Sequence, residues 1–554
     1  MARRSVLPPI ARRGPTLLVL GLAGALAASG CGSDDPPAAS AGTTASGGNL
    51  TFASEKEPDC FDPQVSQADI TGVILRNVYE SLVVQKPDGS YAPWLATKWK
   101  VSPDGRRYTF SLRDGVRFSD GTPFDAAAVK ANFDRIADPK TKSKYAISLL
   151  GPYRDSRVLD PRTVEVRFKS RFATFLRSAS TTYLGFHSTK SIEEHGSRLC
   201  AGSPVQVGTG PFLLRSYVRG QRLELVRNPR YDSAPATAGH RGPAHLDRLT
   251  FRFVPDPTVR VGSVVSHQVD VADVVPPNQI DQIARDATLK LVGTETPGVG
   301  YTYFLNSDNS LFRDRRLRLA VQQAFDVEAA VKAVYFGKYR RAWSVLSPAT
   351  LGYDRALEGT WKHDPQAAGR LLDEAGYAKR DGDGYRTKDG KRLSTRLLYV
   401  PQYTSEDRAA LDQALQADLK KAGIELKLVP LDAAAYEPVR NRGDYGLIAF
   451  AWGGADPDIL RVLFDSSQLF DDGGNNAARL HDPQVDRWLR AAGATSDVGE
   501  RKRLYALVQQ KLIGDGDALP TGVIQRQIAT RKTVTGLRFD ANGWPLFYDV
   551  AKQG

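Results

Sequence analysis

A tryptophan, two glycines and two aspartates lie close together in the segment YGLIAFAWGGADPD. The apolar run 447–451 has the length of a strand and is too short for a typical helix. It leads directly into Trp452, Gly453 and Gly454, and Asp456 follows two residues later. An aromatic plate, backbone free of side-chain bulk and a carboxylate at the end of a buried strand are suited to holding a small molecule. A core strand that leaves through an ordinary Gly/Asp turn fits the same residues.

The neighbouring segments predict a parallel sheet whose strands end near this tryptophan. Two strand-like segments, 393–400 and 424–429, flank a helical one. A β-α-β unit of this kind makes its two strands parallel, and the strand before Trp452 should join the same sheet. Ligands of such sheets gather beyond the carboxyl ends of the strands. We therefore expect Gln402 and Tyr403 to lie on the same edge as Trp452.

The chain shows no constellation for catalysis or for metal binding. It contains no phosphate-binding Walker loop, no GxSxG elbow and no HExxH pair, and its seven histidines are scattered. The stretch 381–384, DGDG, is similar to a calcium loop, but Tyr385 and Arg392 stand where ligands belong, so a hairpin turn is the better interpretation. We expect no enzyme activity, no catalytic residue, no metal and no cofactor.

Length and charge limit the possible classes further. A chain of 554 residues is too long for one core, so two or three domains are expected. The formal charge of +13 is scattered without a basic tract or stripe, which argues against a nucleic-acid partner.

The amino end has the features of an export signal. Arginines precede an apolar run that continues to about Ala28 and falls short of the roughly 20 residues needed to cross a bilayer. The segment 26–31, LAASGC, is similar to a bacterial lipobox, so residues 1–30 would be a signal peptide and Cys31 the lipidated first mature residue. Residues 31–48 would then be a flexible tether. A secreted protein with an incidental cysteine is the alternative.

Two further cysteines, Cys60 and Cys200, remain once Cys31 is lipidated. Outside the cytoplasm an even pair of cysteines is expected to be oxidised, so we predict a disulfide between them. Two buried thiols are the alternative.

The segment 97–135, TKWKVSPDGRRYTFSLRDGVRFSDGTPFDAAAVKANFDR, closely resembles the signature of the family 5 extracellular solute-binding proteins. These are the dipeptide, oligopeptide and nickel receptors of ABC importers. Further matches follow in the family's order, and together they cover essentially all of residues 49–554: VGTGPF at 207–212, LVRNPRY at 225–231, YFLN at 303–306, the stretch 317–336 and LLDEAGY at 371–377.

This resemblance implies an α/β fold of the periplasmic-binding-protein-like type II (cluster C), with two lobes, an extra subdomain and a hinge. The first lobe would comprise 49–82, 205–294 and 518–554, the extra subdomain 83–204, and the second lobe 295–517. Ligand would sit in the cleft between the lobes, and hinge closure would exclude water. The closed receptor, a monomer held near the outer face of the cytoplasmic membrane by its lipid, would dock on the permease subunits of the importer.

The resemblance also implies a ligand-binding role for Trp452 and its neighbours, and it adds Tyr303, Asn306 and Glu57 to the candidate site. In peptide-binding members an aspartate three residues after the tryptophan takes the α-ammonium of the ligand. Here Ala455 stands at that position. Either Asp456 moves into the role or the ligand lacks a free ammonium.

An oligopeptide or dipeptide is the expected solute. A non-peptide solute such as chelated nickel, a sugar or an amine is the alternative for the same receptor role. An exported enzyme or assembly factor on this fold is a second class of function, which only an unrecognised catalytic triad would support.

Overall fold

The structure is a computed structural model that describes residues 47–202, 205–495 and 497–553. The predicted signal peptide, the lipidation site Cys31 and nearly all of the tether lie outside these residues, so they stay predictions. Across the described part of the chain, no helix has both the length and the apolar character that crossing a bilayer requires.

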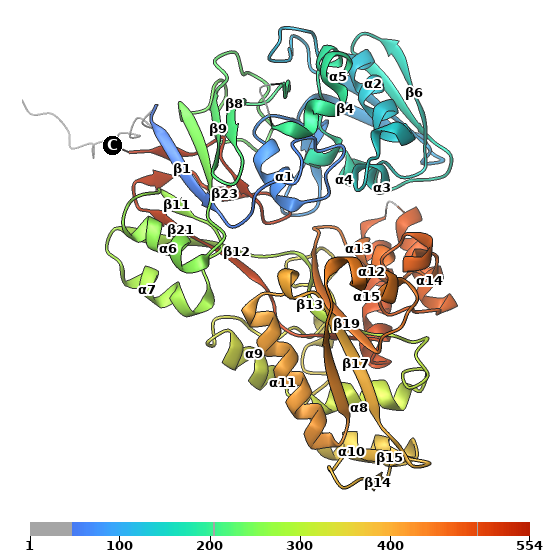
Figure 1. The fold of residues 1–554 in the computed structure, drawn as a ribbon. Helices are drawn as coiled ribbons and strands as arrows, with labels where there is room; N and C mark the ends of the chain where they lie inside the picture. The colour runs from blue at the N-terminus through green and yellow to red at the C-terminus, as the bar shows by residue number, and fades with distance from the viewer. Residues whose placement is uncertain (1–46, 203–204, 496, 554) are drawn as a thin grey trace, which may run out of the picture. The chain divides into compact units, whose positions relative to one another are not determined.

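The largest sheet brings together strands from both ends of the chain (Figure 1). β1 pairs in parallel with β10 and β11, whereas the remaining neighbours are antiparallel. Alternate residues Leu50 and Phe52 of β1 are fully buried, and the Phe52 ring packs against Phe251 and Phe547 with centroids 5.5 and 5.2 Å away. The seven strands, in spatial order, are β12 (Leu289–Glu295), β21 (Gln525–Arg531), β11 (Val271–Ala272), β1 (Asn49–Ser54), β10 (Arg248–Phe253), β9 (Arg222–Arg227) and β8 (Phe212–Val218).

A second, five-stranded sheet contains the predicted β-α-β unit. β17 pairs in parallel with both β18 and β19, which confirms the parallel pairing expected from the sequence. The helix between β17 and β18 is α11 (Glu406–Ala422), and it ends at Gly423 in the left-handed conformation that favours glycine. The strands, in spatial order, are β18 (Glu425–Pro430), β17 (Ser394–Tyr399), β19 (Leu447–Gly453), β13 (Gly298–Leu305) and β20 (Ala518–Pro520).

The chain passes between these two sheets at two places. The first is 296–297, between β12 and β13, and the second is 521–524, between β20 and β21. The two connections lie side by side, because the amide of Thr296 donates to the carbonyl of Ile524 at 2.9 Å. β20 pairs with β13, so residues 518–520 belong with the second sheet and not with the first lobe, where we expected them.

A third sheet lies within the predicted extra subdomain. Its antiparallel strands are, in spatial order, β4 (Ala96–Val101), β5 (Arg107–Leu112), β7 (Thr163–Phe168) and β6 (Tyr153–Asp160). Tyr108, Phe110 and Leu112 of β5 are buried at alternate positions. The helix α2 (Ala126–Ala137) packs against β6 and β7, and the Asp125 carboxylate caps it by accepting from the Ala128 amide at 2.9 Å.

Shorter strands and the remaining helices complete the described fold. The strands β14 and β15 form the hairpin expected from the sequence, and Asp381 lies in its turn. The Asp381 carboxylate binds Arg392 at 2.6 Å, so an arginine occupies it and not a calcium ion. The other short strands are β16 (Lys391–Arg392), paired with β15 (Arg386–Lys388) beside β14 (Lys379–Arg380), and the pairs β2 (Val83–Gln85) with β3 (Tyr91–Pro93), β22 (Val534–Thr535) with β25 (Ala551–Lys552), and β23 (Arg538–Phe539) with β24 (Pro545–Leu546). The other α-helices are α1 (Asp69–Leu75), α3 (Ala146–Leu150), α4 (Phe175–Ser178), α5 (Thr189–His195), α6 (Pro257–Val265), α7 (Ile280–Arg285), α8 (Arg315–Ala324), α9 (Val327–Val334), α10 (Pro365–Glu374), α12 (Ala433–Asn441), α13 (Ile459–Phe464), α14 (Pro483–Ala494) and α15 (Val498–Gly514).

Cys60 and Cys200 form a disulfide, as predicted from the sequence. The bond joins the loop before α1 to the short helix η3 (Gly196–Ala201) at the end of the extra subdomain. The Phe61 amide also donates to the Cys200 carbonyl at 3.2 Å. Because 140 residues separate the two cysteines, the bond removes much conformational freedom from the unfolded chain.

Replacing Cys60 and Cys200 together by serine should lower the free energy of unfolding by about 3–5 kcal/mol, the range that the chain-entropy argument gives for a loop of this length. Urea unfolding followed by circular dichroism measures this change. Dithiothreitol should lower the urea midpoint of the wild type and leave that of the double variant unchanged. An unchanged midpoint in both proteins would contradict a stabilising bond.

Candidate ligand-binding site

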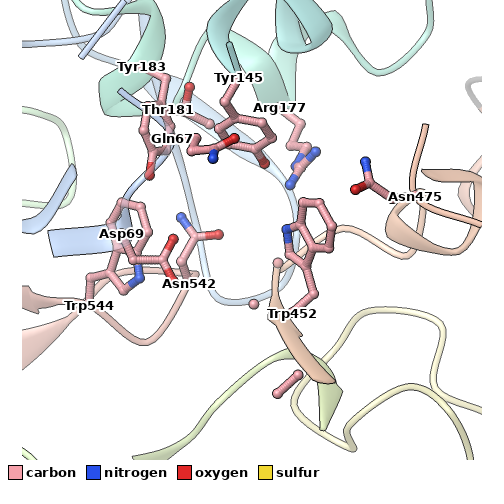
Figure 2. Close-up of a pocket in the computed structure, with 13 residues that line it drawn as sticks. Gln67, Asp69, Tyr145, Arg177, Thr181, Tyr183, Trp452, Asn475, Asn542 and Trp544 are labelled. Atoms are coloured by element: carbon pink, nitrogen blue, oxygen red, sulfur yellow. The ribbon is translucent and has the colours of Figure 1, made fainter. Parts of the chain in front are cut away.

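A pocket of about 390 Å³ opens at the carboxyl end of β19 (Figure 2). Its walls come from α1, from α4, from the end of β19 and from the turn between β23 and β24. Most of the lining side chains carry an aromatic ring, an amide or a charge. The lining residues are Gln67, Asp69, Tyr145, Arg177, Thr181, Tyr183, Ala451, Trp452, Gly453, Gly454, Asn475, Asn542 and Trp544.

Trp452 reaches this pocket because β19 extends beyond the end of its parallel neighbour β17. Leu397 of β17 is level with Leu447, so β17 ends opposite Ala449 and β19 continues for four residues more, or about 13 Å. The short helix η6 (Pro401–Tyr403) follows β17 immediately, and the Tyr403 side chain is 67% exposed. Neither Gln402 nor Tyr403 lines the pocket, contrary to the expectation that both share its edge with Trp452.

Aromatic rings form one side of the pocket. The Tyr183 ring meets Tyr145 edge-on at 4.8 Å and Trp544 at 6.1 Å between centroids. The Tyr183 hydroxyl donates to the Ala68 carbonyl at 3.1 Å, which fixes the ring. The Trp544 ring lies directly on α1, since a Cβ atom at Gly72 would come within 2.5 Å of it. A glycine at this point of the helix therefore makes room for the pocket wall.

Two opposite charges face the same pocket. Asp69 is the first residue of α1 and Arg177 belongs to α4. Neither side chain has an ion-pair partner within 4.0 Å among the described residues. Water in the pocket reaches Asp69, but the protein atoms around it raise the pKa of this carboxyl, an effect that Lys56 and Arg526 partly oppose. Burial lowers the pKa of Arg177, but the nearby Tyr145 and the carboxylate of Asp456 more than offset it, so the guanidinium stays charged.

The two glycines after Trp452 lie next to these charges, Gly453 near Asp69 and Gly454 near Arg177. A Cβ atom at Gly453 would lie 3.9 Å from an Asp69 carboxylate oxygen, and one at Gly454 would lie 3.6 Å from Nη2 of Arg177. Side chains at 453 and 454 would therefore fill the space beside the acid and the cation. The pair of glycines keeps both charges accessible from the pocket.

Asp456, the predicted carboxylate of the site, is not among the lining residues. It is 2% exposed, and its Oδ1 accepts from Nη2 of Arg501 and from the Asp458 amide, both at 2.9 Å. Burial alone would raise its pKa, but the charges of Arg501 and Arg177 lower it. Asp456 is thus an ionised partner of Arg501 within the protein, and the acid that lines the pocket is Asp69.

Three other predicted site residues also have partners elsewhere in the protein. The Tyr303 hydroxyl donates to the buried carboxylate of Asp412 at 2.9 Å. The Asn306 amide donates to the carbonyls of Gly443 and Tyr445, each at 2.9 Å, and the Glu57 carboxylate accepts from the Tyr217 hydroxyl. None of the three lines the pocket, whereas Trp452, Gly453 and Gly454 do.

The sequence analysis missed most of the pocket. Arg177, Asp69 and Trp544 belong to three segments that are far apart in the chain, and none of them lies in a motif with a chemical signature. The one local signal is Gly72, a glycine inside a helix, and it becomes informative only when Trp544 is known to cover it.

This geometry gives a polar and aromatic pocket of a kind that suits a small molecule. Residues 90–469 match the model of the bacterial extracellular solute-binding proteins, family 5 Middle. The chain therefore belongs to this family, whose members are binding receptors and not enzymes, and it is an exported protein.

Individual relatives match over most of their length. The glutathione-binding protein GsiB of Salmonella paratyphi A is 28% identical over 485 residues, which is 86% of this chain and 89% of the relative. The probable D,D-dipeptide-binding periplasmic protein DdpA of Escherichia coli is 27% identical over 506 residues, covering 89% and 91%. The crystal structure of NikA from Brucella suis in complex with Fe(III)-EDTA has a TM-score of 0.81 at 24% identity, covers 91% of this chain and all of its own, and confirms the fold.

Replacing Gly72 by alanine should destabilise the protein by about 1–3 kcal/mol, because the added methyl group overlaps the Trp544 ring and forces it aside. Helix propensity alone predicts the opposite sign. Thermal unfolding measures the change, and near-ultraviolet circular dichroism reports the displaced indole. Gly262→Ala in α6 is the matched control, since its Cβ atom would meet nothing within 4 Å. Equal behaviour of the two variants would contradict the packing of Trp544 on α1.

Replacing Asp456 by asparagine should destabilise the protein by about 3–5 kcal/mol at neutral pH, because it leaves the charge of Arg501 without its buried partner. The pKa of Asp456 is lower in the folded protein, so its contribution is present above the unfolded pKa near 3.8 and is lost as pH falls through the folded value. The stability difference between wild type and variant, measured by urea unfolding, should therefore shrink below about pH 4. A difference that is constant between pH 7 and pH 2.5 would show that the carboxylate is not the stabilising form.

Proposed function

We propose that the protein is the solute receptor of an ABC importer and that it binds a small zwitterionic, peptide-like solute in this pocket. The observation that carries the proposal is the presence of Asp69 and Arg177 on one pocket, each without an ion-pair partner among the described residues. A free amino group would face Asp69 and a free carboxylate would face Arg177. The rings of Trp544 and Tyr183 on one side of the pocket, and that of Trp452 on the other, would cover the apolar part of the solute (Figure 2).

Both charged ends of such a ligand would contribute to the binding free energy. A hydrogen bond to a charged group contributes about 1.5–3 kcal/mol net, and an enclosed pocket strengthens it because water screens it less. Burial raises the pKa of Asp69, and an ammonium group beside it would lower this pKa again by stabilising the ionised carboxylate. Affinity for an amine should then fall as pH drops through that raised pKa, because protonated Asp69 no longer attracts the ammonium.

The family resemblance predicts that an aspartate after the tryptophan binds the α-ammonium of the ligand. In this proposal Asp69 has that role. Ala455 occupies the expected position and Asp456 is bound to Arg501. A chelated metal is the second candidate. The NikA structure holds Fe(III)-EDTA, and an anionic chelate would suit Arg177, but the carboxylate of Asp69 would repel it.

Delivery to a membrane permease completes the proposed cycle. The adjacent connections 296–297 and 521–524 are the places where the chain could flex to close the pocket. A lipid at Cys31 would hold a monomeric receptor at the outer face of the cytoplasmic membrane. Mass spectrometry of solute that co-purifies with the protein, and of the mature amino terminus, tests the ligand and the anchor separately.

Calorimetric titration with a dipeptide and its two blocked forms should assign the charges. The wild type should prefer the free dipeptide over both the N-acetylated and the C-amidated form by about 10- to 150-fold. Asp69→Asn should remove only the preference for the free amino group, and Arg177→Gln only the preference for the free carboxylate, because each variant removes one charge.

Tyr403→Ala is the matched control, because this exposed ring lies outside the pocket and its loss should change no affinity. Equal affinity of the wild type for all three peptides would refute a zwitterionic ligand. Loss of binding in Tyr403→Ala but not in Asp69→Asn would place the site at the end of β17 instead.

A further inference from the structure

A buried arginine, Arg341, lies near α9 in a region separate from the pocket at Trp452. The guanidinium of Arg341 packs against two indoles, 3.7 Å from the ring centre of Trp343 and 4.1 Å from that of Trp361, and the planes of these two rings are 78° apart. The side chain is only 9% exposed, and Nε and Nη2 are buried without a hydrogen-bond partner. Within the described ranges no carboxylate lies within 4.0 Å of it. Arg341 is therefore a buried cation without an anion.

The two rings offset only part of the cost of this burial. A desolvated cation–π contact contributes about 2 kcal/mol, whereas removing an ion from water costs several kcal/mol even after the protein relaxes. Burial accordingly lowers the pKa of Arg341 to about 10, although the more distant Glu328 and Asp326 act in the opposite direction. The arrangement holds a planar donor in a fixed orientation, which is how arginine binds carboxylates.

Arg341 lines a pocket of about 360 Å³ that is separate from the site at Trp452. Nε and Nη2 are its buried, unpartnered nitrogens, which leaves Nη1 as the nitrogen that a ligand in the pocket would contact. Lys332 and Arg340 add positive charge, and Arg340 is already paired with Glu295 at 2.7 Å. Val331 and Val523 give the same pocket an apolar wall.

We propose that this pocket binds a small organic carboxylate with an apolar body, with its carboxylate on Arg341. The acids Glu328 and Glu358 at the rim disfavour a ligand of high negative charge, and the hydroxyl of Tyr353 already donates to Glu358 at 3.2 Å. Aromatic and aliphatic walls favour an apolar body over a bare inorganic anion. The site does not depend on the solute that occupies the pocket at Trp452.

Benzoate is a suitable probe, and isothermal titration at constant ionic strength is the measurement. The wild type should bind benzoate saturably, and Arg341→Gln should weaken binding at least ten-fold. Arg341→Lys, which keeps the charge but loses the planar guanidinium, should weaken it as well and serves if the glutamine variant does not fold. Arg370→Gln, an exposed arginine on α10, is the matched control and should bind like the wild type.

Three further titrations distinguish binding at Arg341 from binding in the pocket at Trp452 and from attraction by charge or by apolar surface alone. Arg177→Gln should still bind benzoate, and loss of binding there would overturn the proposal by placing benzoate in the other pocket. Benzyl alcohol, which lacks the charge, and inorganic phosphate, which lacks the apolar body, should each bind at least ten-fold more weakly. Equal binding of either probe, or unchanged binding by both Arg341 variants, would overturn the proposal too.

Discussion

The close pairing of Gly298 with Gly453 is the constraint on which the position of the pocket depends. Gly298 begins β13 with φ of +108°, and a Cβ atom there would lie 2.3 Å from the Trp452 carbonyl oxygen. A side chain at 298 would push the end of β19 away from β13. Because Gly298 has no side chain, β19 can continue beyond its parallel neighbour β17 and carry Trp452 into the pocket. The Thr350 hydroxyl accepts from the Gly298 amide at 2.7 Å and holds the start of β13.

The pattern of paired and unpaired charges explains why the acid of the site is not the one nearest the tryptophan in sequence. Two buried carboxylates elsewhere in the fold are matched by arginines, Asp456 by Arg501 and Asp62 by Arg135. Pairing of this kind satisfies the desolvated charge but makes the group unavailable to a ligand. Asp69 and Arg177 are left without such partners among the described residues, and a solute with matching charges would complete them.

The sequence predicts the local architecture well and the pocket poorly. The β-α-β unit and the disulfide follow from short patterns, and the structure confirms both. Apolar residues recur every four positions from Ile70 to Leu82, a pattern that predicts a helix over 70–82. The helix α1 ends at Leu75 instead, because the carbonyls of Asn77 and Val78 accept from the amides of Phe212 and Gly210, and this long-range pairing outweighs the apolar periodicity.

The pocket residues depend on information that no local pattern contains. Gln402 and Tyr403 were expected beside Trp452 because parallel strands end at one edge, but the register of β17 against β19 sets how far each strand reaches, and periodicity does not reveal it. Arg177 lies in α4 of the extra subdomain and Trp544 in the turn between β23 and β24, so only the long-range packing of these segments brings them to the pocket. Only the residues at and just beyond the end of β19, Trp452 to Gly454, could be predicted.

Long-range contacts, which no local sequence pattern predicts, also hold Asp69 in place. The disulfide fixes Cys60, and the carbonyl of this residue accepts from the Thr71 hydroxyl at 3.0 Å, near the start of α1. Asp62 binds Arg135 of α2 and His187 at 3.0 Å, which ties the same loop to the extra subdomain. The segment that ends in Asp69 is therefore anchored at several points before any solute arrives. A carboxylate held in this way loses little conformational freedom on binding, so more of its attraction for an ammonium group appears as affinity.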